Sequence, residues 1–199
     1  MTIMSKTEKR QALLKAAAEA VRARQEMCEN YLDEIISMAA ALTRTLKKGG
    51  VIYLAGNGGS AADCDHFATE LVVRLTGRFD RPPLAAVSLA ANASMLTAAG
   101  NDYGMEQTFA RQVQALAGKK DVLIIISTSG NSPNLVEAAR TALSKGVAVF
   151  ALLGSGGGKV ARHARRAIIV PSGCVQRIQE EHIFIIHNLV HLVEQDLFG

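Results

Sequence analysis

Residues 53–71, YLAGNGGSAADCDHFATEL, join a short apolar segment to a helix-like segment through a turn that holds three glycines. The segment after the turn carries His66 and Glu70, so side chains with acid–base chemistry follow directly on a glycine-rich backbone. An apolar strand, a glycine-rich turn and a helix in this order are typical of a parallel α/β unit whose turn approaches a ligand closely. The stretch therefore predicts the fold class and places a chemical function at its turn.

The rest of the chain alternates apolar strands with helix-forming segments. The runs are apolar nearly throughout, as strands covered by helices on both faces are, and the alternation predicts a parallel sheet. The fold class is therefore α/β, a three-layer α/β/α sandwich with five parallel strands. The five runs are VIYLAG (51–56), PLAAVSL (83–89), DVLIIIS (121–127), AVFALLG (148–154) and AIIVP (167–171).

Long helical segments lie at both ends of the chain. Residues 5–48 contain neither glycine nor proline and place apolar residues at helical spacing, which predicts one long helix or two stacked helices. We interpret residues 1–199 as a single domain in which residues 1–48 form a helical N-terminal extension. Residues 176–198 form a helix that is apolar around most of its circumference, which favours burial between subunits. The alternative is a central core helix of its own chain.

The composition excludes several classes of protein. The 199 residues are 49% hydrophobic and 20% charged, which indicates a folded, globular chain. The 22 basic residues are scattered and there is no tryptophan, so the net charge of +4 favours anionic small molecules over nucleic acid. The sequence contains no run of 18 apolar residues, the length that a membrane-spanning helix needs. Its three cysteines are widely spaced and offer no disulfide framework. We expect a cytoplasmic protein.

Two glycine-rich segments resemble nucleotide sites only in part. Gly56, Gly58 and Ala61 have the spacing G-x-G-x-x-A of a dinucleotide turn, but VSLAANASM (87–95) offers no acidic residue for the ribose. GSGGGKV (154–160) places its Gly-Lys pair one residue early for a P-loop and has Val160 where magnesium binding needs Ser or Thr. Neither NAD binding nor nucleotide hydrolysis is expected.

A second turn, STSGNSPN (127–134), concentrates hydroxyl groups where a strand meets a helix. The N-terminus of a helix has free N–H donors and the positive end of the helix dipole, so it binds a phosphate without lysine. The alternative is ordinary capping by Ser132 with Pro133 at the first helical position. One cap accounts for one hydroxyl and not for four, which favours a phosphomonoester site at this turn.

Histidines and carboxylates on the helices are the remaining candidates. His66 and Glu70 lie four residues apart, so both face one side of a helix and suit a metal ion or an acid–base pair. The alternative is an ordinary surface pair. His187 lies in the apolar stretch IFIIHNLV (183–190), which predicts that it is buried, either as a catalyst or as a core residue. Neither motif decides the function alone.

Four segments resemble, in order, the corresponding segments of phosphoheptose isomerases, which have the sugar isomerase (SIS) fold: GNGGSAADCDHFATEL (56–71), GNDYG (100–104), STSGNSPN (127–134) and RIQEEHIFIIHNLV (177–190). The resemblance implies an enzyme that interconverts sedoheptulose 7-phosphate and D-glycero-D-manno-heptose 7-phosphate. That reaction lies on the route to the heptose of bacterial surface glycans such as lipopolysaccharide. The resemblance also implies a homotetramer with active sites near the subunit contacts.

The resemblance implies roles for individual residues as well. Glu70 and His187 match the proton-transfer pair, and one Zn²⁺ per subunit would be held by His66, Glu70, Gln179 and His187. Eight residues of helix span about 12 Å, so Gln179 is the weakest of these ligands. The substrate would be bound by Asn57, Gly58 and Gly59 at the sugar, by Asn101 and Asp102 at its hydroxyls, by Ser127, Thr128, Ser129 and Ser132 with Ser60 at the phosphate, and by Glu70 and Gln179.

Two points in this assignment stay open. The connection RLTGRFDRPP (74–83) is slightly longer than is usual in the family, so the role of Arg74 is undecided. SIS domains also serve as non-catalytic sugar-phosphate-binding regulators, one of which binds the bacterial replication initiator, and the fold alone does not distinguish the two functions. A pure binding module needs no carboxylate and histidine that face the sugar carbonyl, so Glu70 and His187 favour an enzyme.

Overall fold

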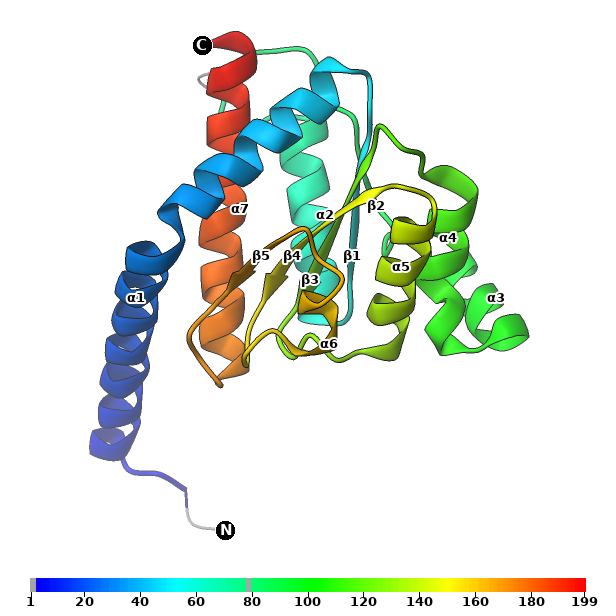
Figure 1. Cartoon of the computed structure of the whole chain (residues 1–199). Helices are drawn as coiled ribbons and strands as arrows, with labels where there is room; N and C mark the ends of the chain where they lie inside the picture. Colours follow the sequence, from blue (N-terminus) through cyan, green and yellow to red (C-terminus); the bar gives the residue numbers. More distant parts are fainter. Residues whose placement is uncertain (1–2, 78–79) are drawn as a thin grey trace.

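The computed structural model describes residues 3–77 and 80–199. Its centre is one sheet of five parallel strands in the order β2-β1-β3-β4-β5 (Figure 1). Each strand overlaps one of the five apolar runs, which confirms the predicted parallel sheet and the α/β class. The strands are β1 (Ile52–Gly56), β2 (Ala86–Ser88), β3 (Val122–Ser127), β4 (Ala148–Leu153) and β5 (Arg166–Ile169).

The strands are apolar nearly throughout because helices cover both faces of the sheet. Along β1, Ile52 and Leu54 point into one hydrophobic core, whereas Tyr53 and Ala55 point into the other. α1 (Lys6–Lys47), α2 (Gly59–Val72) and α7 (Val175–Phe198) pack on the first core. α4 (Thr108–Leu116) and α5 (Pro133–Ser144) pack on the second. The result is the predicted three-layer α/β/α sandwich.

Shorter helical segments complete the second layer. α3 (Ala93–Tyr103) and the 3₁₀ helix η1 (Met105–Gln107) precede α4, and α6 (Gly158–Ala161) follows β4. In Figure 1, α3 lies beside α4 at the margin of the molecule, and it contributes no fully buried residue. No helix in the described part of the chain is both long and apolar enough to span a membrane.

α1 is one continuous helix with two different halves. It begins with a capping box, in which the Glu8 N–H donates to Ser5 Oγ at 3.3 Å and the Ser5 N–H donates to Glu8 Oε2 at 2.7 Å. Its first half extends beyond the body of the molecule (Figure 1), and Leu13 there is exposed. Its second half is part of the first core, where Met38 and Leu42 are fully buried. Only the first half is therefore an extension.

α7 is a central core helix of its own chain. Six of its aliphatic side chains are fully buried within a single chain. The apolar character of α7 is therefore explained by its place in the core and does not require burial between subunits. α1 carries more exposed large apolar side chains than any other helix of the described chain. The buried side chains of α7 are Ile178, Ile185, Ile186, Leu189, Val190 and Val193, and the exposed ones of α1 are Leu13, Leu14, Val21, Leu32 and Ile36.

Candidate active site

The two turns predicted to bind substrate lie side by side at one edge of the sheet. β1 and β3 are neighbours in register, with Gly56 opposite Ile126, so the turns that follow them leave the sheet together. The chain runs from β1 to β2 on one side and returns with β3 on the other, which makes this the point where the strand order reverses. In open parallel sheets of this strand order, ligands bind in the crevice at such a point.

A small polar cavity of about 80 Å³ occupies that crevice. Among the described residues, no hydrogen bond engages the side-chain hydroxyls of Ser60, Thr128 and Ser132. Ser127 Oγ accepts the Gly130 N–H at 3.1 Å, and Ser129 Oγ accepts the Asn131 N–H at 3.2 Å, which orders the turn. The lining residues are Asn57, Ser60, Ile126, Ser127, Thr128, Ser129 and Ser132.

The hydroxyl of Ser132 does not cap the helix that it precedes. Ser132 is the N-cap residue of α5, and Pro133 stands at the first helical position as predicted, but the serine side chain makes no capping hydrogen bond. Its hydroxyl lines the cavity instead. The capping alternative therefore explains Pro133 and leaves Ser132 free to bind an anion at the positive end of α5.

Glycines let the first turn approach its neighbours closely. Gly58 has φ +56° and ψ −123°, a conformation that residues with a Cβ rarely adopt. A Cβ on Gly59 would lie 2.3 Å from Gln179 Nε2, so glycine allows the side chain of α7 to reach the first turn of α2. Gln179 thus lies beside the glycine turn, at the start of α2.

A pair of asparagines, one of which the sequence did not single out, joins the two turns. Asn57 Nδ2 donates to Asn134 Oδ1 at 3.0 Å, and Asn134 Nδ2 donates to Asn57 Oδ1 at 2.9 Å. Asn134 stands at the second position of α5, directly after Ser132 and Pro133, and that place next to the hydroxyl-rich turn was the available signal. The reciprocal bonds hold the turn after β1 against the turn after β3.

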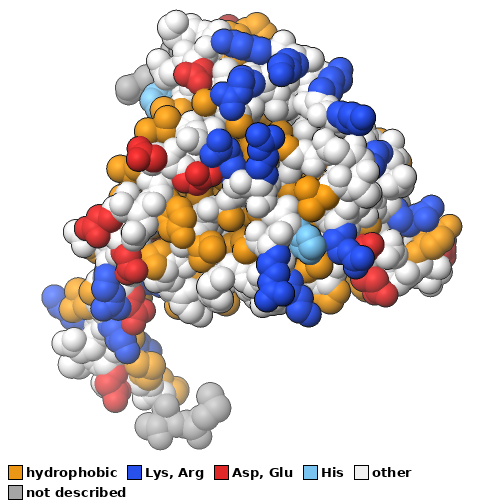
Figure 2. Space-filling view, viewed as in Figure 1, with side chains coloured by type: hydrophobic (Ala, Val, Ile, Leu, Met, Phe, Trp, Pro, Cys, Tyr) orange, Lys and Arg blue, Asp and Glu red, His pale blue; other side chains and the backbone are white. Residues whose placement is uncertain are grey.

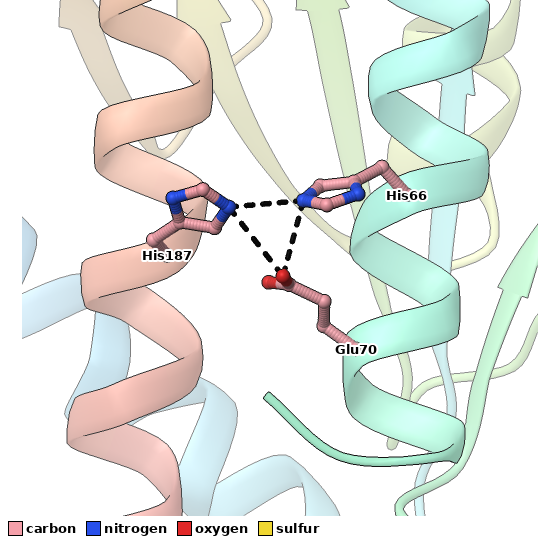
Figure 3. Close-up of side chains that lie close together, drawn as sticks. All are labelled: His66, Glu70 and His187. Carbon is pink, nitrogen blue, oxygen red and sulfur yellow. Dashed lines mark hydrogen bonds and ion pairs between the residues drawn. The ribbon is translucent and has the colours of Figure 1, made fainter. Parts of the chain in front are cut away.

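The predicted acid–base residues meet farther along α2 (Figure 3). Their nearest atoms form a triangle: His66 Nε2 lies 3.1 Å from Glu70 Oε1 and 3.0 Å from His187 Nε2, and His187 Nε2 lies 3.4 Å from Glu70 Oε1. His66 and Glu70 come from successive turns of α2, while His187 comes from α7 (Figure 3). The presence of a third member from another helix argues against an ordinary surface pair. We refer to these three residues as the His–Glu cluster.

The prediction that His187 is buried is wrong. Its side chain is 45% exposed, and that of His66 is 43% exposed. His182, five residues earlier on α7, is the buried histidine of this helix, and burial lowers its pKa to about 4. Five residues correspond to about 140° around a helix, so one histidine faces the core while the other faces the open side between α7 and α2.

Glu70 is the buried member of the cluster. Burial raises the pKa of its carboxyl group, and the neighbouring His66 and His187 oppose that rise. Oε1 faces both histidines, whereas Oε2 is buried without a hydrogen-bond partner among the described residues. A carboxylate with a raised pKa and a free oxygen is suited to accept a proton near neutral pH.

The same three atoms could hold a metal ion. Two imidazole nitrogens and a carboxylate oxygen form a usual zinc ligand set, and all three atoms lie within 4.8 Å of one another. Ligand atoms on a tetrahedral zinc ion lie about 3.3 Å apart, given bonds of about 2.0 Å, so the observed separations fit. Gln179 packs against Gly59 instead, two helical turns before His66, and its role as a fourth ligand stays a prediction.

Other predicted residues lie outside the cavity and the cluster. Asn101 and Asp102 are exposed on α3, where Asn101 Nδ2 donates to Asp102 Oδ1 at 2.8 Å, and neither lines the cavity at the turns. Arg74 is exposed after the end of α2. Residues 78–79 of the connection lie outside the described residues.

Asp63 is a second residue that sequence reasoning missed. It is buried on α2, its Oδ2 has no hydrogen-bond partner among the described residues, and burial raises its pKa to about 6 against the opposing effect of His66. Its spacing of three residues before His66 and seven before Glu70 puts all three on one side of α2 and was the available signal. Polar groups thus line α2 from Ser60 to Glu70.

Comparison with known proteins places the chain in a family. The model of the SIS domain family matches residues 15–154. Phosphoheptose isomerases of Trichlorobacter lovleyi and Burkholderia pseudomallei are each 45% identical, the first over 88% of both chains and the second over 92% of both. The structure of phosphoheptose isomerase from Neisseria gonorrhoeae superposes with a TM-score of 0.87 at 39% identity, covering 94% of this chain and 98% of that one. On the evidence of its fold, its turns and these relatives, the chain belongs to the SIS domain family, among the phosphoheptose isomerases.

Proposed function

We propose that this protein interconverts sedoheptulose 7-phosphate and D-glycero-D-manno-heptose 7-phosphate. The observation that carries the proposal is the order of groups along α2. Ser60 at its start lines the cavity of the hydroxyl-rich turns, and His66 and Glu70 follow about 9 Å and 15 Å farther along the helix axis. The substrate has its phosphate and its carbonyl at opposite ends of a seven-carbon chain. One helix therefore presents an anion site to one end and an acid–base pair to the other.

The acid–base pair suits a proton transfer through an enediol. Glu70 takes the proton from C1 of the ketose while His187 donates a proton to the oxygen on C2. The enediol then collapses: His187, which has given up its proton, takes the proton of the C1 hydroxyl, and Glu70 returns a proton to C2, which gives the aldose. Each proton that leaves carbon or oxygen is thus replaced at the neighbouring position. A general base and acid of this kind contribute roughly 10² to 10⁴ in rate.

His66, Glu70 and His187 are also the residues that would hold Zn²⁺, with Gln179 the weaker fourth ligand. A zinc ion bound there would supply a Lewis acid to polarise the substrate carbonyl. A Glu70 carboxylate that ligates zinc is less free to accept a proton, so the two roles compete for the same oxygen atoms. Exhaustive chelation, checked by elemental analysis, separates them: loss of turnover that zinc restores supports a catalytic ion, and full turnover of metal-free protein excludes one.

The alternative function is a non-catalytic regulator that binds a sugar phosphate. Such a protein needs the hydroxyl-rich turns but not the His–Glu cluster. Here the carboxylate is buried with a raised pKa and meets two histidines within 3.4 Å, which is a demanding arrangement for a group with no chemical task. No observation in the structure favours the regulator.

The deciding experiment is turnover of sedoheptulose 7-phosphate by the purified protein in deuterated water. We expect aldose formation and deuterium at C2 of the aldose, since the base carries a proton that exchanges with solvent. Sedoheptulose without its phosphate is the control substrate, and the Glu70→Gln variant is the control protein. Binding of the heptulose phosphate without any aldose or deuterium incorporation would contradict the proposal and favour the regulator.

Finer features of the family extend the proposal. We infer a homotetramer, a cytoplasmic location and a place in the formation of heptose for surface glycans. The apolar side chains exposed on α1, such as Leu32 and Ile36, support association through helices. Light scattering at micromolar concentration tests the first inference, since a mass near the 21.2 kDa of one chain would exclude a tetramer.

A further inference from the structure

A buried arginine, Arg81, contacts the last turn of α2, the turn that carries Glu70. Arg81 Nη2 donates to the carbonyl oxygen of Glu70 at 2.7 Å, and Nη1 donates to that of Leu71 at 2.8 Å. The last carbonyl groups of a helix have no partner within the helix, and a positive charge there complements the helix dipole. Arg81 therefore caps the helix that presents Glu70.

The same arginine ties α2 to α7. Arg81 Nε donates to Glu194 Oε1 at 2.8 Å, and this oxygen also accepts the Leu75 N–H at 3.3 Å. The Arg81 side chain is 0% exposed and that of Glu194 is 4% exposed. Glu194 lies seven residues, or two helical turns, after His187 on α7. One buried guanidinium thus links the helix of Glu70 to the helix of His187.

Such a link matters because Glu70 and His187 come from different helices. A displacement of about 1 Å between catalytic groups can cost about 10² in rate, so the relative position of α2 and α7 has to be held closely. A guanidinium offers its donors in a rigid planar fork, so three acceptors on two helices take one arrangement around it. A buried ion pair is often no more stabilising than apolar residues of similar size. We therefore expect the pair of Arg81 and Glu194 to control the relative position of α2 and α7 more than the stability of the fold.

We propose that Arg81, held by Glu194, is a positioning residue that sets the placement of Glu70 relative to His187 for proton transfer. The inference rests on the proposed function, because it takes these two residues as the proton-transfer pair. Arg81 contacts the backbone of Glu70 and not its carboxylate, so it acts through the position of the last turn of α2. The hydroxyl-rich turns that would bind phosphate lie at the other end of that helix and stay unchanged.

The test compares Arg81→Met with a matched variant, Arg24→Met. Arg24 also pairs with a buried glutamate of α7, Glu181, but it joins α7 to α1 and does not touch α2. We expect Arg81→Met to lower kcat by about 10- to 100-fold, as loss of an outer-shell partner does, with KM within about twofold. Arg24→Met should lower the melting temperature and keep kcat. Arg81→Lys should recover part of the lost turnover, because lysine keeps the charge without the fork.

Three outcomes decide the proposal. Equal losses of melting temperature in Arg81→Met and Arg24→Met, with wild-type kcat in both, would show a merely structural role. Should Arg81→Met fail to fold, Arg81→Lys keeps the charge and removes the fork, and a kcat equal to that of the wild type would overturn the inference. Wild-type kcat in Glu70→Gln would instead overturn the base assignment itself, so failure of the proposed function is seen in a different variant.

Discussion

The cavity at the turns and the His–Glu cluster are built in opposite ways. The cavity is lined by residues within 57–60 and 126–132, two short segments at the ends of neighbouring strands, and most of the lining side chains carry a hydroxyl or amide group. The cluster draws on side chains 121 residues apart in the sequence, which meet only because α2 packs against α7. The first site is therefore a property of strand ends, and the second is a property of helix packing.

Under the proposed function, this difference assigns phosphate binding to the ends of the strands and proton transfer to the packing of two helices. Neighbouring parallel strands fix the cavity through backbone hydrogen bonds, so its shape survives small shifts of the helices. The cluster changes with every displacement of α2 against α7. Figure 2 shows the Lys and Arg side chains of one face in several groups, with Asp and Glu side chains beside some of them. Variants that break one region while sparing the other test whether binding and chemistry are separable.

The largest effect is expected from Glu70→Gln. Glutamine keeps the size of the side chain and cannot accept a proton from carbon, so kcat should fall by roughly 10² to 10⁴ while KM stays near the wild-type value. The kcat of His187→Gln should fall by a factor in the same range. Steady-state kinetics with sedoheptulose 7-phosphate measure both constants. An equal rise of KM in Glu70→Gln would mean that the two regions are not separable.

The double variant Ser129→Ala and Ser132→Ala should act on the other region. Hydrogen bonds to a charged group contribute about 1.5–3 kcal/mol each, so the loss of one or two should raise KM by at least about tenfold with kcat changed less. Ser144→Ala, at the far end of α5, is the control. Unchanged affinity for the sugar phosphate in the double variant would place the phosphate elsewhere.

Asp63 gives a prediction that depends on pH. Burial raises its pKa from 3.8 to about 6, so the ionised carboxylate destabilises the folded protein above about pH 6, and this effect vanishes as the pH falls through 3.8. Asp63→Asn should therefore increase the free energy of unfolding by up to about 3 kcal/mol at pH 8 and by little near pH 4. Urea unfolding of chelator-treated protein measures it.

The exposed neighbour Asp65 supplies the control for that experiment. Asp65→Asn should leave the free energy of unfolding nearly unchanged at both pH values. A decrease in stability for Asp63→Asn at pH 8 would show that the ionised carboxylate has a favourable partner in the folded protein, and burial would then not be its dominant interaction.

The smallest effect is expected from Asn134→Ala. It removes both amide hydrogen bonds to Asn57, which together contribute about 1–3 kcal/mol to stability. KM should rise a few-fold because the two turns lose their mutual support, and kcat should hardly change because the His–Glu cluster is separate. Thermal unfolding and kinetics of the same sample measure the two effects. A drop in kcat without a change in KM would show that the cavity and the His–Glu cluster depend on each other.

The sequence was most informative about features that local backbone structure determines. The five strands, the hydroxyl-rich turn and the glycine turn could all be predicted, because strand runs and turn residues are local signals. The burial of His187 could not, since a helix that is apolar all round does not reveal which side faces the core. Arg81 and Asn134 were missed for a related reason: each matters through a partner that only the packing of distant segments supplies.

The two halves of α1 differ in what they contribute to the fold. Folding of a single chain requires the half that begins near Met27, because its side chains complete the first core. The half before it could be shortened or fused to another domain without removing any fully buried side chain up to residue 22. The N-terminal half of α1 is thus a segment that protein engineering can shorten or extend while the buried core of the fold is left intact.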